Sequence, residues 1–209
     1  MPYDWKAYYI GVKGEVSPPR PEQMPSRRYL AYGSSITHGG DAVRPTGTYA
    51  MGIARALGCD LINLGFAGSA QMDIALAHYI ANREDWDFAT IEMGINVIDS
   101  WDTATFAGKV GDFLTVLASR RPDRWLFITD LYLNRRDFDG SGKVKEYREA
   151  VQRAVHNLAF RRAVYIPGTR IVRSAPELTS DLVHPSAAGH EAMAARWVRE
   201  IESRLNGEA

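Results

Sequence analysis

Short apolar runs alternate along the chain with segments in which apolar residues recur every three or four positions. This alternation is typical of a parallel sheet with helices on both faces, because each strand is then buried on both sides. We therefore expect an α/β fold of the three-layer, flavodoxin-like type, with a five-stranded parallel sheet flanked by helices. The predicted strands are 29–33, 61–65, 88–94, 125–130 and 163–168.

Four segments between and after these runs have helical spacing. The first, 48–58, ends in a glycine suited to a helix C-cap. In open sheets of this kind ligands bind at the carboxyl ends of the strands, so the residues directly after each run are the candidates for chemistry. The other three helices are predicted from Phe106 to Leu117, from Val144 to Leu158 and from Met193 to Leu205.

The first 26 residues follow a different pattern. Residues 7–16 (AYYIGVKGEV) predict a short strand or hairpin, and residues 17–26 contain four of the ten prolines. Proline at this density favours an extended, semi-rigid chain. We interpret 1–26 as an N-terminal arm, which could be part of an accessory domain or hold two subunits together as a homo-oligomer, and 27–209 as one domain.

Composition narrows the classes of protein to consider. Of 209 residues, 45% are hydrophobic and 24% are charged. A chain of this length and composition can bury one hydrophobic core that needs no disulfides, and Cys59 is the single cysteine. The 25 basic and 25 acidic residues cancel, so we expect no nucleic-acid partner and no membrane partner. No run approaches the ~20 apolar residues of a membrane span, and no signal peptide is visible, so we expect a cytoplasmic protein.

The segment DLVHP near the C-terminus has the clearest local chemistry. Proline disfavours the helical conformation in the residue before it and is itself suited to a first helical position. We therefore expect His184 in a loop and Pro185 at the start of the final helix. Asp181, three residues earlier, could accept the Nδ1–H of His184 and leave Nε2 as a base.

A serine hydroxyl and three amide donors are expected at the same edge of the sheet. Ser35 follows the first strand, and a serine becomes nucleophilic when a base removes its proton during attack. The backbone N–H groups of Ser35 and Gly68 and the side-chain amide of Asn96 come from three strand ends. They could converge on the oxyanion formed from an ester carbonyl.

Four blocks, GSSIT, NLGFAGS, GIN and DLVHP, occur in that order within residues 28–205. With these four blocks in this order, the chain resembles the SGNH hydrolases of the GDSL esterase and lipase superfamily. The resemblance implies that Ser35 is the nucleophile, that Gly68 and Asn96 complete the oxyanion hole, and that Asp181 and His184 are orienter and base.

Two positions depart from the family pattern. Ser34 replaces a common aspartate, and Val97 follows Asn96 where many members have aspartate. We expect Ser34 to alter hydrogen bonding in the nucleophile turn without removing the nucleophile. Val97 is expected to change how the asparagine loop is supported.

The predicted substrate is a small-molecule or carbohydrate ester. A site at the rim of the sheet is open and favours small acyl groups, and similar family members include acetyl esterases that act on carbohydrates. The same triad would also support thioester cleavage or acyl transfer. His38, three residues after the nucleophile, is a candidate substrate contact, and the loop 134–142 could form part of the crevice wall.

Alternative functions explain fewer of these residues. The hydroxyl-rich segment 33–39 also resembles a flavin-phosphate loop, but this reading gives GIN and DLVHP no purpose. An inactive scaffold would not need all five candidate groups, which are Ser35, Gly68, Asn96, Asp181 and His184. A metal site from Asp181, His184 and His190 lacks the usual compact ligand set, so we expect neither a metal nor a cofactor.

Overall fold

A five-stranded parallel sheet forms the centre of the computed structural model, which describes residues 11–207. The strand order is β2-β1-β3-β4-β5. β2 and β3 therefore lie on opposite sides of β1, and the connection from β2 crosses β1 to reach β3. In such sheets the crevice lies at the carboxyl ends of the strands, beside the point where the strand order reverses. The strands are β1 (Arg27–Gly33), β2 (Cys59–Gly65), β3 (Phe88–Glu92), β4 (Trp125–Thr129) and β5 (Ala163–Ile166).

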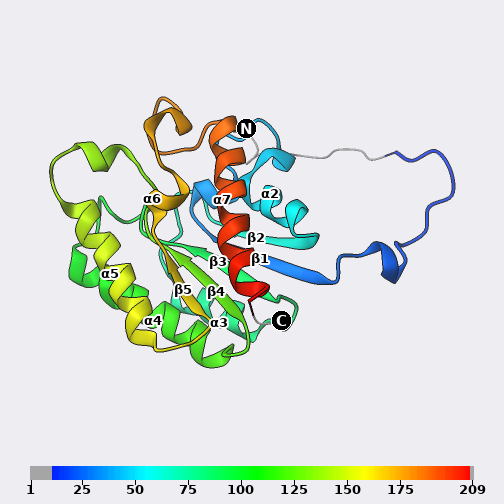
Figure 1. Ribbon diagram of the computed structural model, residues 1–209, viewed down its shortest axis with the longest axis horizontal. Helices are drawn as coiled ribbons and strands as arrows, with labels where there is room; N and C mark the ends of the chain where they lie inside the picture. Colours follow the sequence, from blue (N-terminus) through cyan, green and yellow to red (C-terminus); the bar gives the residue numbers. More distant parts are fainter. Residues whose placement is uncertain (1–10, 208–209) are drawn as a thin grey trace.

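Helices cover both faces of this sheet (Figure 1). The long helices α4 (Thr103–Arg120) and α5 (Lys143–Leu158) pack together on one face with α3 (Ile74–Asn82). On the other face α2 (Tyr49–Ala56) packs against α7 (Ala187–Leu205). The remaining helical turns are α1 (Ser35–His38), α6 (Gly168–Ile171) and the 3₁₀ turns η2 (Pro21–Gln23), η3 (Pro45–Gly47), η4 (Arg135–Phe138) and η5 (Ala175–Glu177).

Successive side chains of the central strands enter two separate cores. Leu30 and Tyr32 of β1 belong to the core beneath α4 and α5, whereas Tyr29 and Ala31 belong to the core beneath α2 and α7. This follows from the two-residue period of a strand. Both faces are buried, which explains why β1 reads as a continuous apolar run. The predicted α/β fold class and its five parallel strands are confirmed.

Two helix predictions need correction. The helix α3 has no counterpart among the four predicted helices. The final helix begins at Ala187, not at Pro185, because the Ser186 hydroxyl accepts the backbone N–H of Gly189 and is the N-cap. Pro185 instead pairs with Leu178 in an isolated antiparallel bridge.

The described segment before β1, residues 11–26, is exposed throughout. Of the strand or hairpin predicted at 7–16, residues 7–10 lie outside the described part, and 11–16 form no strand. In residues 11–26 the one helical turn is η2, and the residues on either side of it, Arg20 and Met24, are extended. The division into arm and domain stays a prediction. Between residues 11 and 207 there is no helix of the length and apolarity that crossing a membrane requires.

Gly65 ends β2 where the chain passes the nucleophile turn. A Cβ at this position would lie 2.1 Å from the backbone nitrogen of His38 and 2.5 Å from its Cα. Because backbone cannot rotate away as a side chain can, Gly65→Ala is expected to lower the free energy of unfolding by roughly 1–3 kcal/mol. Urea denaturation measures this change.

Gly108 provides the control for this substitution. It lies within α4, and an added Cβ would have no neighbour within 4 Å. Gly108→Ala should raise the free energy of unfolding by roughly 0.5–1 kcal/mol, because alanine favours helix over glycine. Equal effects of the two substitutions would show that the close approach at Gly65 does not constrain the fold.

Candidate active site

The turn after β1 presents Ser35 at the carboxyl edge of the sheet. Ser34 is the N-cap of α1, and its hydroxyl accepts the backbone N–H of Ile36 at 3.1 Å. The helix ends after one turn because Gly39 adopts a left-handed conformation with φ of 116°. Ser35 is therefore held at the first position of a short, capped helix, with 8% of its surface exposed.

A buried carboxylate lies beneath this turn. Glu92, the last residue of β3, accepts the backbone N–H of Ser34 at 2.8 Å. It also accepts the hydroxyls of Ser34 and Thr37, each at 2.8 Å. Burial raises the pKa of Glu92, while these hydrogen bonds oppose the rise. Sequence reasoning missed Glu92, although a carboxylate at the end of a buried strand was a visible signal.

The Glu92 carboxylate accounts for the departure at position 34. A serine hydroxyl can donate to a carboxylate, whereas an ionised aspartate only accepts hydrogen bonds. An aspartate here would place a second negative charge beside Glu92 in a buried site. Ser34 thus changes the hydrogen bonding of the turn, and the turn still carries Ser35.

The carboxylate of Asp181 organises the loop that carries His184. Its Oδ1 accepts the backbone N–H groups of Val183 at 2.8 Å and His184 at 2.9 Å, and the Thr179 hydroxyl at 2.8 Å. Its Oδ2 lies 2.6 Å from the Nδ1 of His184. Burial alone would raise the pKa of Asp181, but the hydrogen bonds from His184, Val183 and Thr179 outweigh it and hold the pKa well below its ordinary value.

The structure brings the predicted hydroxyl and imidazole together across 149 positions of sequence. Ser35 Oγ lies 2.7 Å from the Nε2 of His184. Because Nδ1–H donates to the ionised Asp181, Nε2 carries the lone pair and accepts the Ser35 hydroxyl. Asp181, His184 and Ser35 thus form one continuous hydrogen-bonded chain.

Gly68 and Asn96 line the same cavity as Ser35, which has a volume of about 390 Å³. Gly68 has a φ of 72°, a conformation that glycine adopts without strain. The Oδ1 of Asn96 accepts the backbone N–H of Ala70 at 3.0 Å, so its Nδ2 is the end that can donate to a ligand. The three predicted amide sources therefore border one space.

Val97 supports the Asn96 loop by packing. Its side chain is fully buried in the core beneath α4 and α5. Its carbonyl accepts the backbone N–H of Trp101 at 2.9 Å and the hydroxyl of Tyr147 at 3.3 Å. At this position the side chain thus supports the loop through apolar packing.

Three further polar residues, His38, His190 and Asp41, have partners that define their roles. The Nδ1 of His38 hydrogen-bonds the Gly65 carbonyl at 3.0 Å, and His38 is not part of the cavity wall. His190 is fully buried between the Tyr49 N–H and the Gly40 carbonyl, away from the proposed ligand set. Asp41 Oδ2 lies 3.8 Å from the Nδ1 of His184, and sequence reasoning did not identify it.

These positions also test the metal alternative. Within residues 11–207 the side chains close enough to share an ion are Asp41, Asp181 and His184, and His190 is not among them. Both imidazole nitrogens of His184 already have partners, Asp181 and Ser35. Coordination through His184 would break one of these hydrogen bonds, so the donor set does not fit an ion.

The sequence also matches a known protein family. A model of the GDSL-like Lipase/Acylhydrolase family matches residues 31–192, which is more than half of the chain. The chain belongs to the GDSL-like lipase/acylhydrolase family. The resemblance to GDSL and SGNH hydrolases that the four sequence blocks indicate is thereby confirmed. Comparison with curated proteins finds no match.

Solved structures of this fold extend the comparison. A salicylyl-acyltransferase from a tetracycline biosynthetic pathway is 25% identical, with a TM-score of 0.75 over 85% of this chain and 54% of its own. A putative GDSL-like lipase from Bacteroides ovatus is 23% identical, with a TM-score of 0.75 over 87% of this chain and 54% of its own. A family two carbohydrate esterase from Cellvibrio japonicus is 20% identical, with a TM-score of 0.69 over 86% and 62%. This family member thus spans about half the length of the first two.

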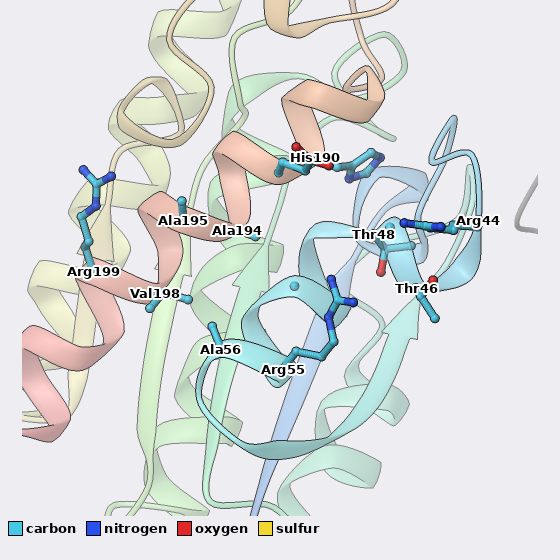
Figure 2. Close-up of a pocket in the computed structure, with 13 residues that line it drawn as sticks. Arg44, Thr46, Thr48, Arg55, Ala56, His190, Ala194, Ala195, Val198 and Arg199 are labelled. Carbon is cyan, nitrogen blue, oxygen red and sulfur yellow. The ribbon is translucent and has the colours of Figure 1, made fainter.

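A larger cavity of this GDSL-like chain, about 460 Å³, lies between α2 and α7. Figure 2 shows Arg55 on α2 and Val198 on α7 facing this space, with Arg44 on the preceding loop. None of the residues Ser35, Gly68, Asn96, Asp181 and His184 lines it. The candidate active site of this chain is therefore the smaller cavity.

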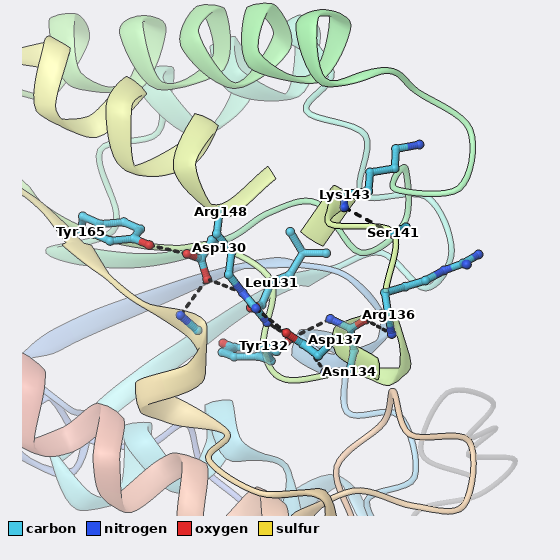
Figure 3. Close-up of polar contacts among 11 residues, drawn as sticks. Asp130, Leu131, Tyr132, Asn134, Arg136, Asp137, Ser141, Lys143, Arg148 and Tyr165 are labelled. Atoms are coloured by element: carbon cyan, nitrogen blue, oxygen red, sulfur yellow. Dashed lines mark hydrogen bonds and ion pairs between the residues drawn. The ribbon is translucent and has the colours of Figure 1, made fainter. Parts of the chain in front are cut away.

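The wall of the smaller cavity includes Arg135 and Arg136, so part of the loop 134–142 borders the crevice. Figure 3 shows Arg148 of α5 reaching Asp137, a residue of the turn η4. Arg148 pairs with the carboxylate of Asp137 and lies 3.9 Å from that of Asp130. Asp130 is itself buried and accepts the Tyr165 hydroxyl and the Gly168 N–H.

Burial raises the pKa of Asp130 from 3.8 to about 6, although its hydrogen bonds and Arg148 lower it. Because the folded pKa exceeds the unfolded one, ionisation costs stability as pH rises from about 4 to above 6. Asp130→Asn removes the ionisable carboxyl group and with it this cost. Relative to wild type, its free energy of unfolding should rise by roughly 2 kcal/mol between pH 4.5 and pH 7.

Urea denaturation at both pH values measures the effect. Asp112→Asn, on the exposed face of α4, is the matched control and should change stability by less than about 0.5 kcal/mol at either pH. If the difference between wild type and Asp130→Asn is the same at both pH values, Asp130 does not ionise with a raised pKa.

Proposed function

We propose that the chain is a serine hydrolase that cleaves carboxylic esters through a covalent acyl-enzyme. The observation that carries this proposal is the contact of 2.7 Å between Ser35 Oγ and His184 Nε2, with Asp181 2.6 Å from the opposite ring nitrogen. An activated nucleophile needs a base within hydrogen-bond reach and a third group that orients the base. All three are present here.

The first half of the reaction forms the acyl-enzyme. Ser35 Oγ attacks the ester carbonyl carbon while its proton passes to His184 Nε2. The carbonyl oxygen becomes an oxyanion, which the N–H groups of Ser35 and Gly68 and the Nδ2 of Asn96 stabilise. When the tetrahedral intermediate collapses, the bond to the alcohol oxygen breaks and His184 returns the proton to that oxygen.

The second half releases the acid. Water enters, gives its proton to His184 and attacks the acyl carbon, and Ser35 leaves with the proton. Asp181 keeps the imidazole oriented and stabilises the imidazolium in both halves. Its low pKa keeps it ionised, so the proton stays on the ring.

The proposed substrates are small acyl esters, such as acetyl esters of carbohydrates or similar alcohols. A cavity of about 390 Å³ lies near the small end of the range for ligand sites. A structural neighbour is a family two carbohydrate esterase. Another is an acyltransferase, and this favours acyl transfer to a second alcohol as the alternative outcome of the same acyl-enzyme.

Covalent trapping tests the acyl-enzyme directly. A 4-nitrophenyl phosphonate should add one phosphonyl group, visible by intact-mass spectrometry, and peptide mapping should place it on Ser35. Ser35→Ala is the negative control. Labelling of the alanine variant, or of another residue in the wild type, would reject Ser35 as nucleophile. Product analysis with glucose present as acceptor separates hydrolysis from transfer.

A further inference from the structure

The wall of the candidate active-site cavity includes a charged group that the triad does not use. Arg135, Arg136 and Asp99 line the cavity together with the apolar side chains of Ile95 and Ile98. An adjoining hollow of about 250 Å³ shares Ile98, Asp99 and Arg136 but has no residue of the triad in its wall. Asp99 and Arg136 therefore lie on the side of the cavity that faces this hollow, and Arg135 is the neighbour of Arg136 in the cavity wall.

Positive charge is in excess on this side. Asp99 is the single carboxylate of the cavity wall and interacts with both arginines. The adjoining hollow adds Asp139 and Lys143, one charge of each sign, so the excess persists. A bound group that carries negative charge would be attracted to this side, because opposite charges at short range stabilise each other.

The two arginines differ in how many of their N–H donors already form hydrogen bonds. Arg136 hydrogen-bonds Asp99 and also Asp139, the latter at 3.2 Å. The contact of Arg135 with Asp99 is an ion pair of 3.7 Å, longer than a hydrogen bond. More than half of the Arg135 side chain is exposed, so its guanidinium retains donors for a ligand.

The turn that carries Arg135 is fixed before any ligand binds. The side chain of Asn134, which is buried, accepts the Arg136 N–H at 3.0 Å and donates to the Tyr132 carbonyl at 2.8 Å. Asp137 accepts the Asn134 N–H at 2.9 Å and is held by Arg148 (Figure 3).

The same turn is also tied to the catalytic loop. The backbone N–H of Arg135 donates to the Leu182 carbonyl at 2.7 Å, one residue from Asp181. The position of Arg135 is thus set relative to the triad, and binding need not order this segment. Such preorganisation lowers the entropic cost of recognition.

We infer that Arg135 is a specificity-determining residue that binds an anionic group, a carboxylate or a phosphate monoester, carried by the ester substrate. This inference rests on the proposed function. A planar guanidinium binds either group through paired hydrogen bonds. The substrate class is therefore a small ester with a negative charge, on its acyl part or on its alcohol part.

Matched esters distinguish the two placements of the charge. On the acyl side, mono(4-nitrophenyl) glutarate is compared with 4-nitrophenyl butyrate, and on the alcohol side 4-acetoxybenzoate with 4-acetoxybenzamide. In at least one pair, the wild type should favour the charged ester in kcat/KM. Arg135→Gln should lower the charged-to-neutral ratio about tenfold, and Arg135→Glu should lower it further.

Arg55→Gln is the matched control, because Arg55 is an exposed arginine that lines only the distant cavity between α2 and α7. Its ratio should equal that of the wild type. If the ratio is unchanged in Arg135→Gln and Arg135→Glu while hydrolysis of the neutral esters depends on Ser35, the inference is overturned and the proposed function stands.

Binding decides the inference if no ester is cleaved, a result that would reject the proposed function. Ligand-observed NMR measures the affinity of benzoate and phenyl phosphate for the Ser35→Ala variant. An affinity that falls about tenfold when Arg135→Gln is added supports the inference. No binding of either anion, or equal affinity with and without Arg135, overturns it.

Discussion

Ser35→Ala and His184→Ala are each expected to lower kcat for 4-nitrophenyl acetate by at least about 10³-fold. Either change removes one end of the 2.7 Å contact through which the proton leaves the hydroxyl. The remaining rate would come from the oxyanion donors and from substrate binding. The double variant should be no slower than about the slower single variant, because the two groups act as one unit.

Spectrophotometric release of 4-nitrophenolate measures these rates. Ser203→Ala and His156→Ala replace an exposed serine and an exposed histidine on α7 and α5, and both should retain the wild-type rate. Circular dichroism establishes that each variant is folded. A Ser35→Ala or His184→Ala protein that is folded and as active as the wild type would exclude the proposed mechanism.

Asp181→Asn is expected to lower kcat by roughly 10³–10⁴-fold. The carboxylate accepts the Nδ1–H of His184, whereas an asparagine amide can donate to Nδ1 and favour the tautomer with its proton on Nε2. That tautomer cannot take the proton of Ser35. The backbone hydrogen bonds from Val183 and His184 can persist to the asparagine Oδ1, so the loop should keep its shape.

Asp41→Asn separates this orienting role from a general effect of negative charge. Asp41 lies 3.8 Å from the same nitrogen, and its φ of 61° suits asparagine as well as aspartate. Its kcat should fall less than about tenfold, with the same assay as readout. If Asp41→Asn and Asp181→Asn were equally impaired, Asp181 would not be the specific partner of His184.

The sequence predicts the sheet because the central strands are buried on both faces and therefore read as apolar runs. β1 and β3 are the clearest cases. The sequence analysis does not predict α3, which is a short helix of 9 residues. The start of α7 was misplaced because two residues in succession, Pro185 and Ser186, both suit a helix start, and the Ser186 side-chain cap decides between them.

In the candidate site, contacts between residues close in the sequence can be predicted, whereas contacts between distant segments cannot. Asp181 and His184 lie three residues apart, so their contact could be expected from local geometry. Glu92 could not be assigned a role, because its partners Ser34 and Thr37 lie on another strand end. The contact that Arg135 and Arg136 share with Asp99 depends on how two loops, one after β3 and one after β4, meet in the folded chain.

The hydrogen bonds between Ser34 and Glu92 also constrain how this lineage can change. Positions 34 and 92 lie 58 residues apart, yet an aspartate introduced at the first meets a carboxylate at the second. Ser34→Asp is therefore expected to be harmful alone, because it sets two carboxyl groups against each other in a buried site. The two positions are expected to be epistatic, so that Ser34→Asp is better tolerated when Glu92 is replaced by an uncharged residue.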